Sequence, residues 1–175
     1  MRLTVKELLY GALLTAVALA IPLAFQGWLQ IAIPPFSATL GSHLPSLLAM
    51  SISPWVAALV GLGSTLGFLV TLGPIVAARA FIHVFFGVIG AHLYRRGLKF
   101  WQVLLLVLPI HALGEALITM PFGFDFYQAL VVVGIGTALH HILDSGLTLV
   151  LYRSLVRADV PLQKTASSKG VVGTL

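Results

Sequence analysis

Seven ionisable residues lie within otherwise apolar stretches of the sequence, in three groups with helical spacing. They are Arg79 and His83, His111 and Glu115, and His140, His141 and Asp144. Residues four positions apart lie on the same face of a helix, so each group can present polar atoms in one direction. An ionisable side chain in the middle of a membrane costs at least ~2.5–3.5 kcal/mol, and such residues are usually paired and usually functional. The three groups therefore indicate a polar site within a membrane protein.

The first two groups lie on consecutive apolar stretches that must run in opposite directions. Arg79 and Glu115 fall at one depth, and His83 and His111 fall about one turn deeper. We therefore expect Arg79 opposite Glu115 and His83 opposite His111, in a pocket that opens outwards. One interpretation is a structural ion pair with histidines that bridge helices. The other is a binding site for a small anion, because an arginine that is only partly neutralised attracts a carboxylate.

A metal-dependent membrane enzyme is the alternative from another functional class. The spacings His111-x-x-x-Glu115 and His140-His141-x-x-Asp144 are compatible with metal ligation. However, the sequence contains no HExxH motif, no serine in a GxSxG motif and no cysteine. We therefore favour a function without catalysis, without a cofactor and without a bound metal ion. A scaffold whose charged pairs only hold helices together is the third interpretation.

Six apolar stretches must position these residues. Hydrophobic residues make up 59% of the 175 residues and charged residues only 9%, which is too few to cover a water-facing surface. We therefore predict an all-α integral membrane protein, a bundle of six transmembrane helices within residues 1–159. The predicted spans cover residues 8–25, 37–52, 54–72, 75–94, 101–120 and 127–152. Residues 26–35 end in two prolines and are expected to form a loop, and the polar tail 160–175 is expected to be disordered.

The basic residues predict the orientation of this bundle. Nine of the ten Lys and Arg residues lie before the first span, after the fourth or after the sixth, and Arg79 is the tenth. Cytoplasmic loops carry an excess of Lys and Arg, so we expect both termini in the cytoplasm. Since these residues are spread over the ends of the spans and form no single patch, the net charge of +5 does not indicate a nucleic-acid partner.

Small residues form a stripe along the first span. Ala12, Ala16 and Ala20 are spaced four apart, and Gly63 and Gly67 offer a similar face on the third span. Such stripes let another helix approach closely within lipid. The partner helix can belong to the same bundle or to another protein, and the spacing alone does not distinguish the two.

These features together resemble the S components of energy-coupling factor vitamin transporters. The resemblance rests on six spans, cytoplasmic termini, the alanine stripe and a long outer loop before a short second span, and it extends to about residue 160. Segments 35–43, 51–54, 63–67 and 77–83 look most like the niacin-type members.

The resemblance implies a function in vitamin uptake. Such a subunit binds a vitamin with high affinity and carries it across the cell membrane of a bacterium or archaeon. It would dock through Ala12, Ala16 and Ala20 on a transmembrane coupling subunit, and two cytoplasmic ATPases would power the transport. The absence of a Walker A motif from this sequence agrees with ATP hydrolysis on other chains. Niacin (nicotinate) is the favoured substrate, and another vitamin such as cobalamin is the alternative.

The expected substrate site joins the polar groups to the loop after the first span. The nicotinate ring is expected to stack near an aromatic side chain (Trp28, Phe36 or Phe122), and Gln30 is expected in the lid together with Trp28 and Phe36. The carboxylate is expected to approach Arg79 and His83. The full set of predicted substrate-binding residues is Arg79, His83, His43, His111, Glu115, Trp28, Phe36 and His140.

Overall fold

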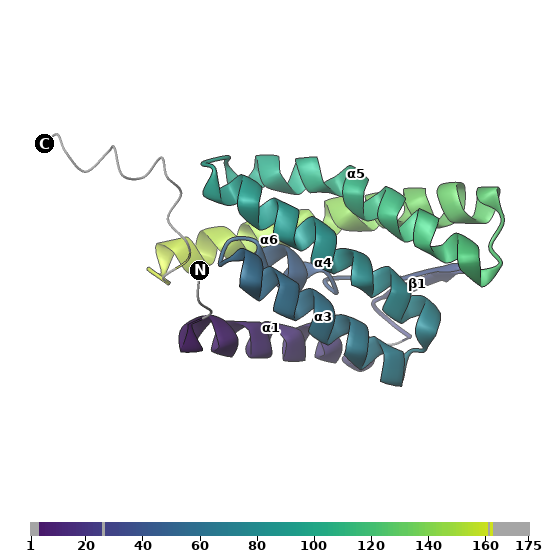
Figure 1. Cartoon of the computed structure of the whole chain (residues 1–175), viewed down its shortest axis with the longest axis horizontal. Helices are drawn as coiled ribbons and strands as arrows, with labels where there is room; N and C mark the ends of the chain where they lie inside the picture. The colour runs from purple at the N-terminus through teal and green to yellow at the C-terminus, as the bar shows by residue number, and fades with distance from the viewer. Residues whose placement is uncertain (1–3, 26, 161, 163–175) are drawn as a thin grey trace, which may run out of the picture.

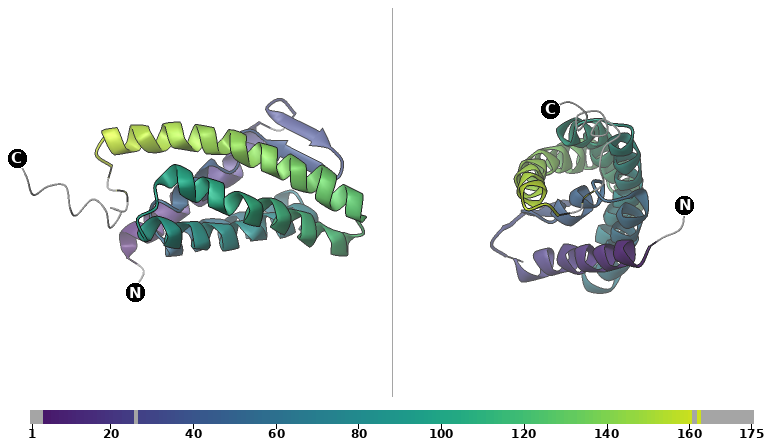
Figure 2. Two further views of the ribbon diagram at one scale, coloured as in Figure 1. Left: turned by 90° about the horizontal axis from the view of Figure 1, so that it is seen from above. Right: turned by 90° about the vertical axis from the view of Figure 1, so that its left-hand side faces the viewer.

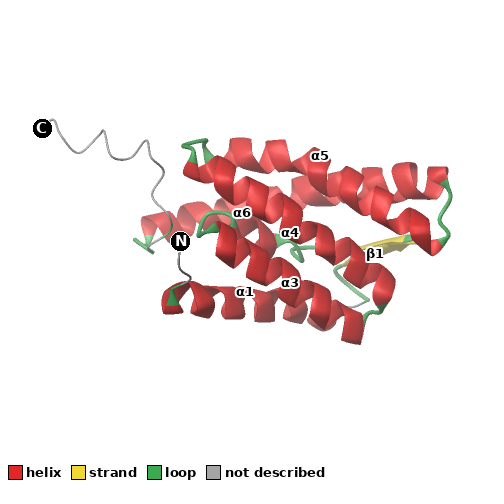
Figure 3. Ribbon diagram, in the orientation of Figure 1, coloured by secondary structure: helices red, strands yellow, loops and turns green. Residues whose placement is uncertain are grey.

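The computed structural model describes residues 4–25, 27–160 and 162, and most of its elements are helices (Figures 1 and 3). In chain order they are α1 (Val5–Ala24), β1 (Gln30–Ile33), β2 (Phe36–Thr39), α2 (Leu44–Ala49), α3 (Pro54–Thr71), α4 (Pro74–Arg95), α5 (Phe100–Thr119), a 3-10 turn (Met120–Phe122), a π-helical segment (Gln128–Ile135) and α6 (Gly136–Arg157). Most of the tail for which disorder is predicted lies outside the described residues, as do Arg2, Lys164 and Lys169.

Within the described residues, five helical segments are long and apolar enough to cross a membrane. They are α1, α3, α4, α5 with the 3-10 turn that follows it, and the π-helical segment with α6. Their bounds agree with the predicted spans to within a few residues, except that α6 continues to Arg157. Local chemistry explains several of the helix starts. Thr4 and Glu7 form a capping box before α1, and Ser53 caps α3 ahead of Pro54.

The prediction of a helix over residues 37–52 is wrong. This stretch begins with strand β2, turns at Gly41 with a φ of 82°, and contains only the six-residue helix α2. Six residues of helix rise about 9 Å, far less than the ~30 Å hydrocarbon core of a bilayer. The glycine breaks the helix because it adopts a left-handed backbone conformation that other residues rarely take. The second predicted span is therefore a strand, a turn and a short helix.

The segment expected to be a loop contains the other strand of a hairpin. Strand β1 pairs antiparallel with β2, from Gln30 opposite Thr39 to Ile33 opposite Phe36. The backbone of Leu40 extends the ladder by donating to the carbonyl of Leu29 at 2.8 Å. In an apolar environment an unpaired backbone group is costly, so a hairpin satisfies the chain better than an open loop.

Helix α2 lies in the middle of the bundle, where the long helices surround it (Figure 2). It contacts α1, α3, α4 and α6, and the side chains of Leu47, Ala49 and Met50 are completely buried. Non-helical backbone at membrane depth is tolerated where protein covers it. The enclosure of this segment explains why the chain can reverse here without a full-length helix.

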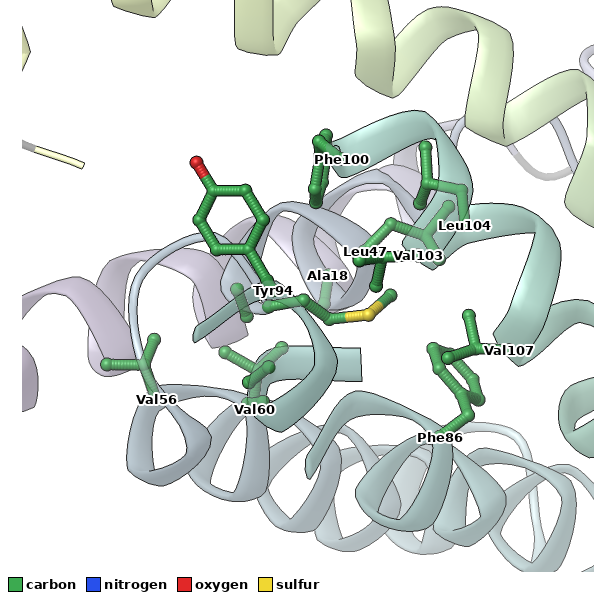
Figure 4. Close-up of a cluster of buried hydrophobic side chains, with 14 of the residues drawn as sticks. Ala18, Leu47, Val56, Val60, Phe86, Tyr94, Phe100, Val103, Leu104 and Val107 are labelled. Carbon is green, nitrogen blue, oxygen red and sulfur yellow. The ribbon is translucent and has the colours of Figure 1, made fainter. Parts of the chain in front are cut away.

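The apolar core fills one half of the bundle. It is built around α2 by side chains of α3, α4 and α5, including Val60, Phe86, Val103 and Val107 (Figure 4). Close helix contacts require glycine here, since a Cβ atom on Gly61 of α3 would lie only 2.7 Å from the backbone nitrogen of Val84 in α4. This contact fixes α4, which carries Arg79 and His83, against α3.

The start of α1, the turn between α4 and α5, and the end of α6 lie together at one end of the bundle (Figures 1 and 2). The basic residues of these segments, among them Lys6, Arg96, Lys99 and Arg157, are therefore gathered at that end. The hairpin lies toward the opposite end. The chain is thus divided into a basic end and an end that carries the hairpin.

Candidate functional site

A cavity of about 150 Å³ lies between the hairpin, α4 and the neighbouring helices. Its polar wall contains Gln30, Ser37, Thr39, Ser42, His43, Arg79, His83, Glu115 and His140. Its apolar wall contains Pro22, Ala38, Phe68, Leu72, Val76 and Ala80. The lining of the cavity therefore combines charged and polar groups with apolar side chains, which suits a small ligand with an anionic group and a flat apolar body.

Arg79 and Glu115 form a buried ion pair, which confirms the predicted pairing. Nε of Arg79 donates to Oε2 of Glu115 at 2.8 Å, and Nη2 lies 2.7 Å from the same oxygen. Nη1 donates to the backbone carbonyl of Ser37 at the longer distance of 3.3 Å. The guanidinium also lies over the ring of Phe36, 5.4 Å from its centroid. The pair thus connects α4 and α5 to strand β2.

Glu115 is the centre of a larger polar cluster. Its Oε2 also accepts a hydrogen bond from the Thr137 hydroxyl at 2.8 Å, and its Oε1 lies 3.1 Å from Nε2 of His111. Nε2 of His83 is 3.6 Å from Oε1, which is beyond hydrogen-bond distance. Glu115 has only 2% of its surface exposed, so these contacts replace its hydration. Thr137 was not predicted, because a lone threonine in an apolar stretch is not a distinctive signal.

Four histidine rings pack around one another at the base of the cavity. The ring centroid of His43 lies 4.9 Å from that of His83, 4.5 Å from that of His111 and 4.4 Å from that of His140. The predicted approach of His83 to His111 is confirmed by a centroid distance of 5.3 Å. His43 is therefore the link between the Glu115 cluster and α6.

Asp144 anchors the irregular second segment to α6. Its Oδ1 accepts from the backbone N–H of Gly41 at 2.7 Å, and its Oδ2 accepts from the backbone N–H of His43 at 2.9 Å. Nε2 of His140 lies 3.1 Å from Oδ2, so the predicted pairing along one face of α6 is also confirmed. Asp144 is fully buried and does not line the cavity. Its contacts support the wall of the cavity from behind.

His141 lies behind the cavity and completes the polar cluster. Its Nε2 donates to the carbonyl of Leu104 at 3.0 Å, and its Nδ1 is 2.9 Å from Nδ1 of His111. The five residues proposed for a metal-dependent enzyme therefore do not form one site. His111 and Glu115 group with His83 and His43, whereas His140 and Asp144 form a second group that also includes His43.

None of the three aromatic residues expected around the ligand lines the cavity, although Phe36 contacts the guanidinium of Arg79. Trp28 is 73% exposed and packs edge-on against Phe25, away from the cavity wall. Phe122 is 41% exposed in the 3-10 turn. Phe36, the first residue of β2, has a buried side chain, and a Cβ atom on Gly136 would lie 2.9 Å from its ring. Gln30 lines the cavity, and Ser37, Thr39 and Ser42 do so without having been predicted.

Comparison with known proteins identifies a relative that is similar to this chain in sequence. The niacin transporter NiaX of Lactococcus lactis subsp. cremoris (strain MG1363) is 31% identical over 171 residues, which cover 88% of this chain and 76% of NiaX. No protein-family model matches the chain, and no solved structure does.

Proposed function

The chain belongs to the family of the niacin transporter NiaX, the niacin-type S components of energy-coupling factor transporters, and from this premise we propose that it binds niacin and carries it across the membrane. In this proposal the ligand occupies the cavity beneath the hairpin. The chain supplies binding and translocation, and ATP hydrolysis takes place on two separate partner subunits. The end that carries the hairpin faces the outside of the cell, and the basic end faces the cytoplasm.

The observation that carries the proposal is an arginine in the wall of a small cavity. Arg79 is only 7% exposed, and its pairing with Glu115 uses Nε and Nη2. Nη1 donates only over 3.3 Å to the carbonyl of Ser37, so a ligand carboxylate could bind there more strongly than this neutral acceptor. We propose that the carboxylate of nicotinate takes this position.

The remaining wall fits the rest of the ligand. The pyridine ring would lie against the apolar wall formed by Phe68, Leu72 and Val76, and the hairpin would cover it. His43, His83 and His140 offer ring nitrogens at the polar wall. The small volume of about 150 Å³ favours a monocyclic ligand over a macrocycle such as cobalamin. Trp28, exposed outside the cavity, has no part in this arrangement.

The function is tested with three small ligands of nearly equal size. Nicotinate, nicotinamide and benzoate are added to the purified protein, and the melting temperature is recorded. We expect strong stabilisation by nicotinate, since a ligand at 100 times its Kd contributes about 2.7 kcal/mol. Nicotinamide lacks the charge and should stabilise much less, whereas benzoate keeps the charge and should be intermediate. Equal effects of nicotinate and nicotinamide would contradict the proposed role of Arg79, and no effect of any ligand would contradict niacin binding.

The alanine stripe of α1 is proposed as the docking surface for the coupling subunit. Ala12, Ala16 and Ala20 are exposed, whereas Gly11 and Ala18 on the other side of α1 are buried within the bundle. The second predicted stripe is used internally, since Gly63 and Gly67 pack against Thr15 and Leu19 of α1. The stripe of α1 is thus free to receive a helix of another chain.

A larger side chain in the alanine stripe should prevent docking on the coupling subunit and leave nicotinate binding unchanged. We expect Ala16→Leu to abolish co-purification with the coupling subunit and to stop niacin uptake, because the larger side chain prevents close helix contact. Nicotinate binding to the isolated protein should be unchanged. Gly146→Leu is the matched control, since it adds the same side chain to an exposed position of α6 with no neighbour within 4 Å of its Cβ. Normal docking of the Ala16→Leu protein would contradict this surface.

A further inference from the structure

We infer that His83, His111 and Glu115, with His43, bind one divalent transition-metal ion at the base of the cavity. Each of the four residues offers a ligand atom, and these atoms all lie within 4.8 Å of one another. All four side chains are buried. Imidazole nitrogen and carboxylate oxygen are the ligands that Zn²⁺ and similar ions take in proteins.

The spacing of these atoms is close to that of a tetrahedral site. Ligands held ~2.0–2.1 Å from a tetrahedral zinc ion lie roughly 3.3 Å apart. Nε2 of His111 is 3.1 Å and Nε2 of His83 is 3.6 Å from Oε1 of Glu115. Two edges of the tetrahedron are therefore present, and small side-chain rotations would bring in His43. The buried Nε2 of His83 has no hydrogen-bond partner among the described residues, which a metal ion would provide.

The buried contacts of His141 and His111 need more hydrogens than two neutral imidazoles carry, so an additional positive charge must lie among them. Three contacts follow one another: Leu104 O to His141 Nε2 at 3.0 Å, His141 Nδ1 to His111 Nδ1 at 2.9 Å, and His111 Nε2 to Glu115 Oε1 at 3.1 Å. Each contact needs one hydrogen or one cation between its atoms, because a carbonyl and a carboxylate only accept. Two neutral imidazoles supply two hydrogens for three contacts. A metal ion between His111 and Glu115 supplies the missing charge without a protonated imidazole in the fully buried core.

The residues behind the ligands are arranged as outer-shell partners of a metal site. Oε2 of Glu115 accepts from Arg79 and Thr137, which orients Oε1 toward the histidines. When His141 donates to Leu104, its Nδ1 can accept the hydrogen on Nδ1 of His111, so that Nε2 of His111 keeps its lone pair for a metal. Hydrogen bonds of this kind to ligating histidines and carboxylates are the usual second layer of metal sites.

A metal ion at this place would also favour nicotinate binding, and this part of the inference rests on the proposed function. A divalent cation beside Arg79 adds positive charge to the wall that receives the nicotinate carboxylate. The sequence favoured a site without a metal ion, because it predicted His83 beside His111 but could not place His43 next to His83, His111 and Glu115. The convergence of these four residues in the structure is the observation that changes the expectation.

Cobalt(II) is a suitable probe, because its visible absorption reports the number and geometry of its ligands. The purified full-length protein is treated with a chelator, freed of it and titrated with cobalt(II). We expect one equivalent to bind, with the spectrum of a four-coordinate site and with displacement by Zn²⁺. His83→Gln and His111→Gln should each weaken binding by at least 10-fold, and His141→Phe by about 10–100-fold as an outer-shell change. The spectrum of the unaltered protein tests the inference even where a variant does not fold.

His92→Gln is the matched control, since His92 lies exposed in the last turn of α4, outside the cluster. This variant should bind cobalt(II) like the unaltered protein. Absence of cobalt binding, or equal binding by all the histidine variants, would overturn the metal site and would show that the additional charge is a proton. Nicotinate binding is measured on the same samples. Nicotinate binding without cobalt binding overturns only the metal site, whereas cobalt binding without nicotinate binding supports the metal site and contradicts the proposed ligand.

Discussion

The double variant Arg79→Met/Glu115→Gln should fold and yet lose nicotinate binding. Truncating one partner of a buried charge pair costs about 2–5 kcal/mol in binding, so we expect the Kd for nicotinate to rise at least about 30-fold. Both charges are removed together because either one alone would be left unpaired in the core. The glutamine can still accept a hydrogen from Thr137, which lies 2.8 Å from Oε2 in the native protein. Replacing both members of a buried ion pair is often neutral for stability.

Two measurements distinguish a binding role of Arg79 from a structural one. The melting temperature without ligand reports the fold, and calorimetric titration with nicotinate reports the site. If the ion pair only joined α4 to α5, the double variant would bind nicotinate as well as the native protein, and the proposed carboxylate position would be wrong. Arg79→Lys serves as a graded control, since it keeps the charge next to Glu115 but removes the forked geometry of the guanidinium. Its affinity should lie between those of the native protein and the double variant.

The long helices and the main ion pair could be predicted because local rules determine them. The apolar stretches were recognised from nearby residues alone. The caps at Thr4 and Ser53, which were not predicted, also depend only on nearby residues. The pairing of Arg79 with Glu115 required one further step, the antiparallel course of two consecutive helices. Because the two residues lie at equal depth on neighbouring helices, their charges were expected to meet.

The hairpin and the short helix α2 could not be predicted, because protein on all sides replaces lipid around them. Residues 37–52 are apolar enough to suggest a span, but Leu47 and Met50 contact other helices and not lipid. Hydropathy measures only whether a segment avoids water and does not distinguish these two apolar environments. The same error misplaced His43, which was expected on a helix and lies in the turn before α2.

The buried polar residues therefore satisfy the backbone of the irregular segment, in addition to the ligand contacts proposed for them. A strand, a turn and a six-residue helix leave more backbone groups to satisfy than a continuous helix does. Thr39 O accepts from His140 at 3.0 Å, Ser37 O accepts from Arg79, and Asp144 accepts from two backbone N–H groups. The polar cluster thus makes an irregular, polar cavity wall possible at membrane depth.

Asp144→Ala should disrupt this wall more than any other single truncation in α6. The change removes the acceptor for the N–H groups of Gly41 and His43 and leaves both donors buried. Breaking a buried charged contact costs about 3–5 kcal/mol, so we expect a clear fall in melting temperature. Since His43 forms part of the cavity wall, nicotinate binding should also weaken, by at least about 10-fold when one charge-assisted hydrogen bond of about 1.5 kcal/mol loses its geometry.

The neighbouring residue provides a matched control for Asp144. The hydroxyl of Ser145 is buried and has no hydrogen-bond partner among the described residues, so Ser145→Ala should leave stability unchanged or raise it slightly. Asp144→Asn should be intermediate, because the amide oxygen can accept from one N–H group while its NH₂ group faces the other. Thermal unfolding and nicotinate titration of the three variants in the same detergent would give the comparison. An Asp144→Ala protein as stable as Ser145→Ala would show that the packing of α2 alone holds the second segment in place.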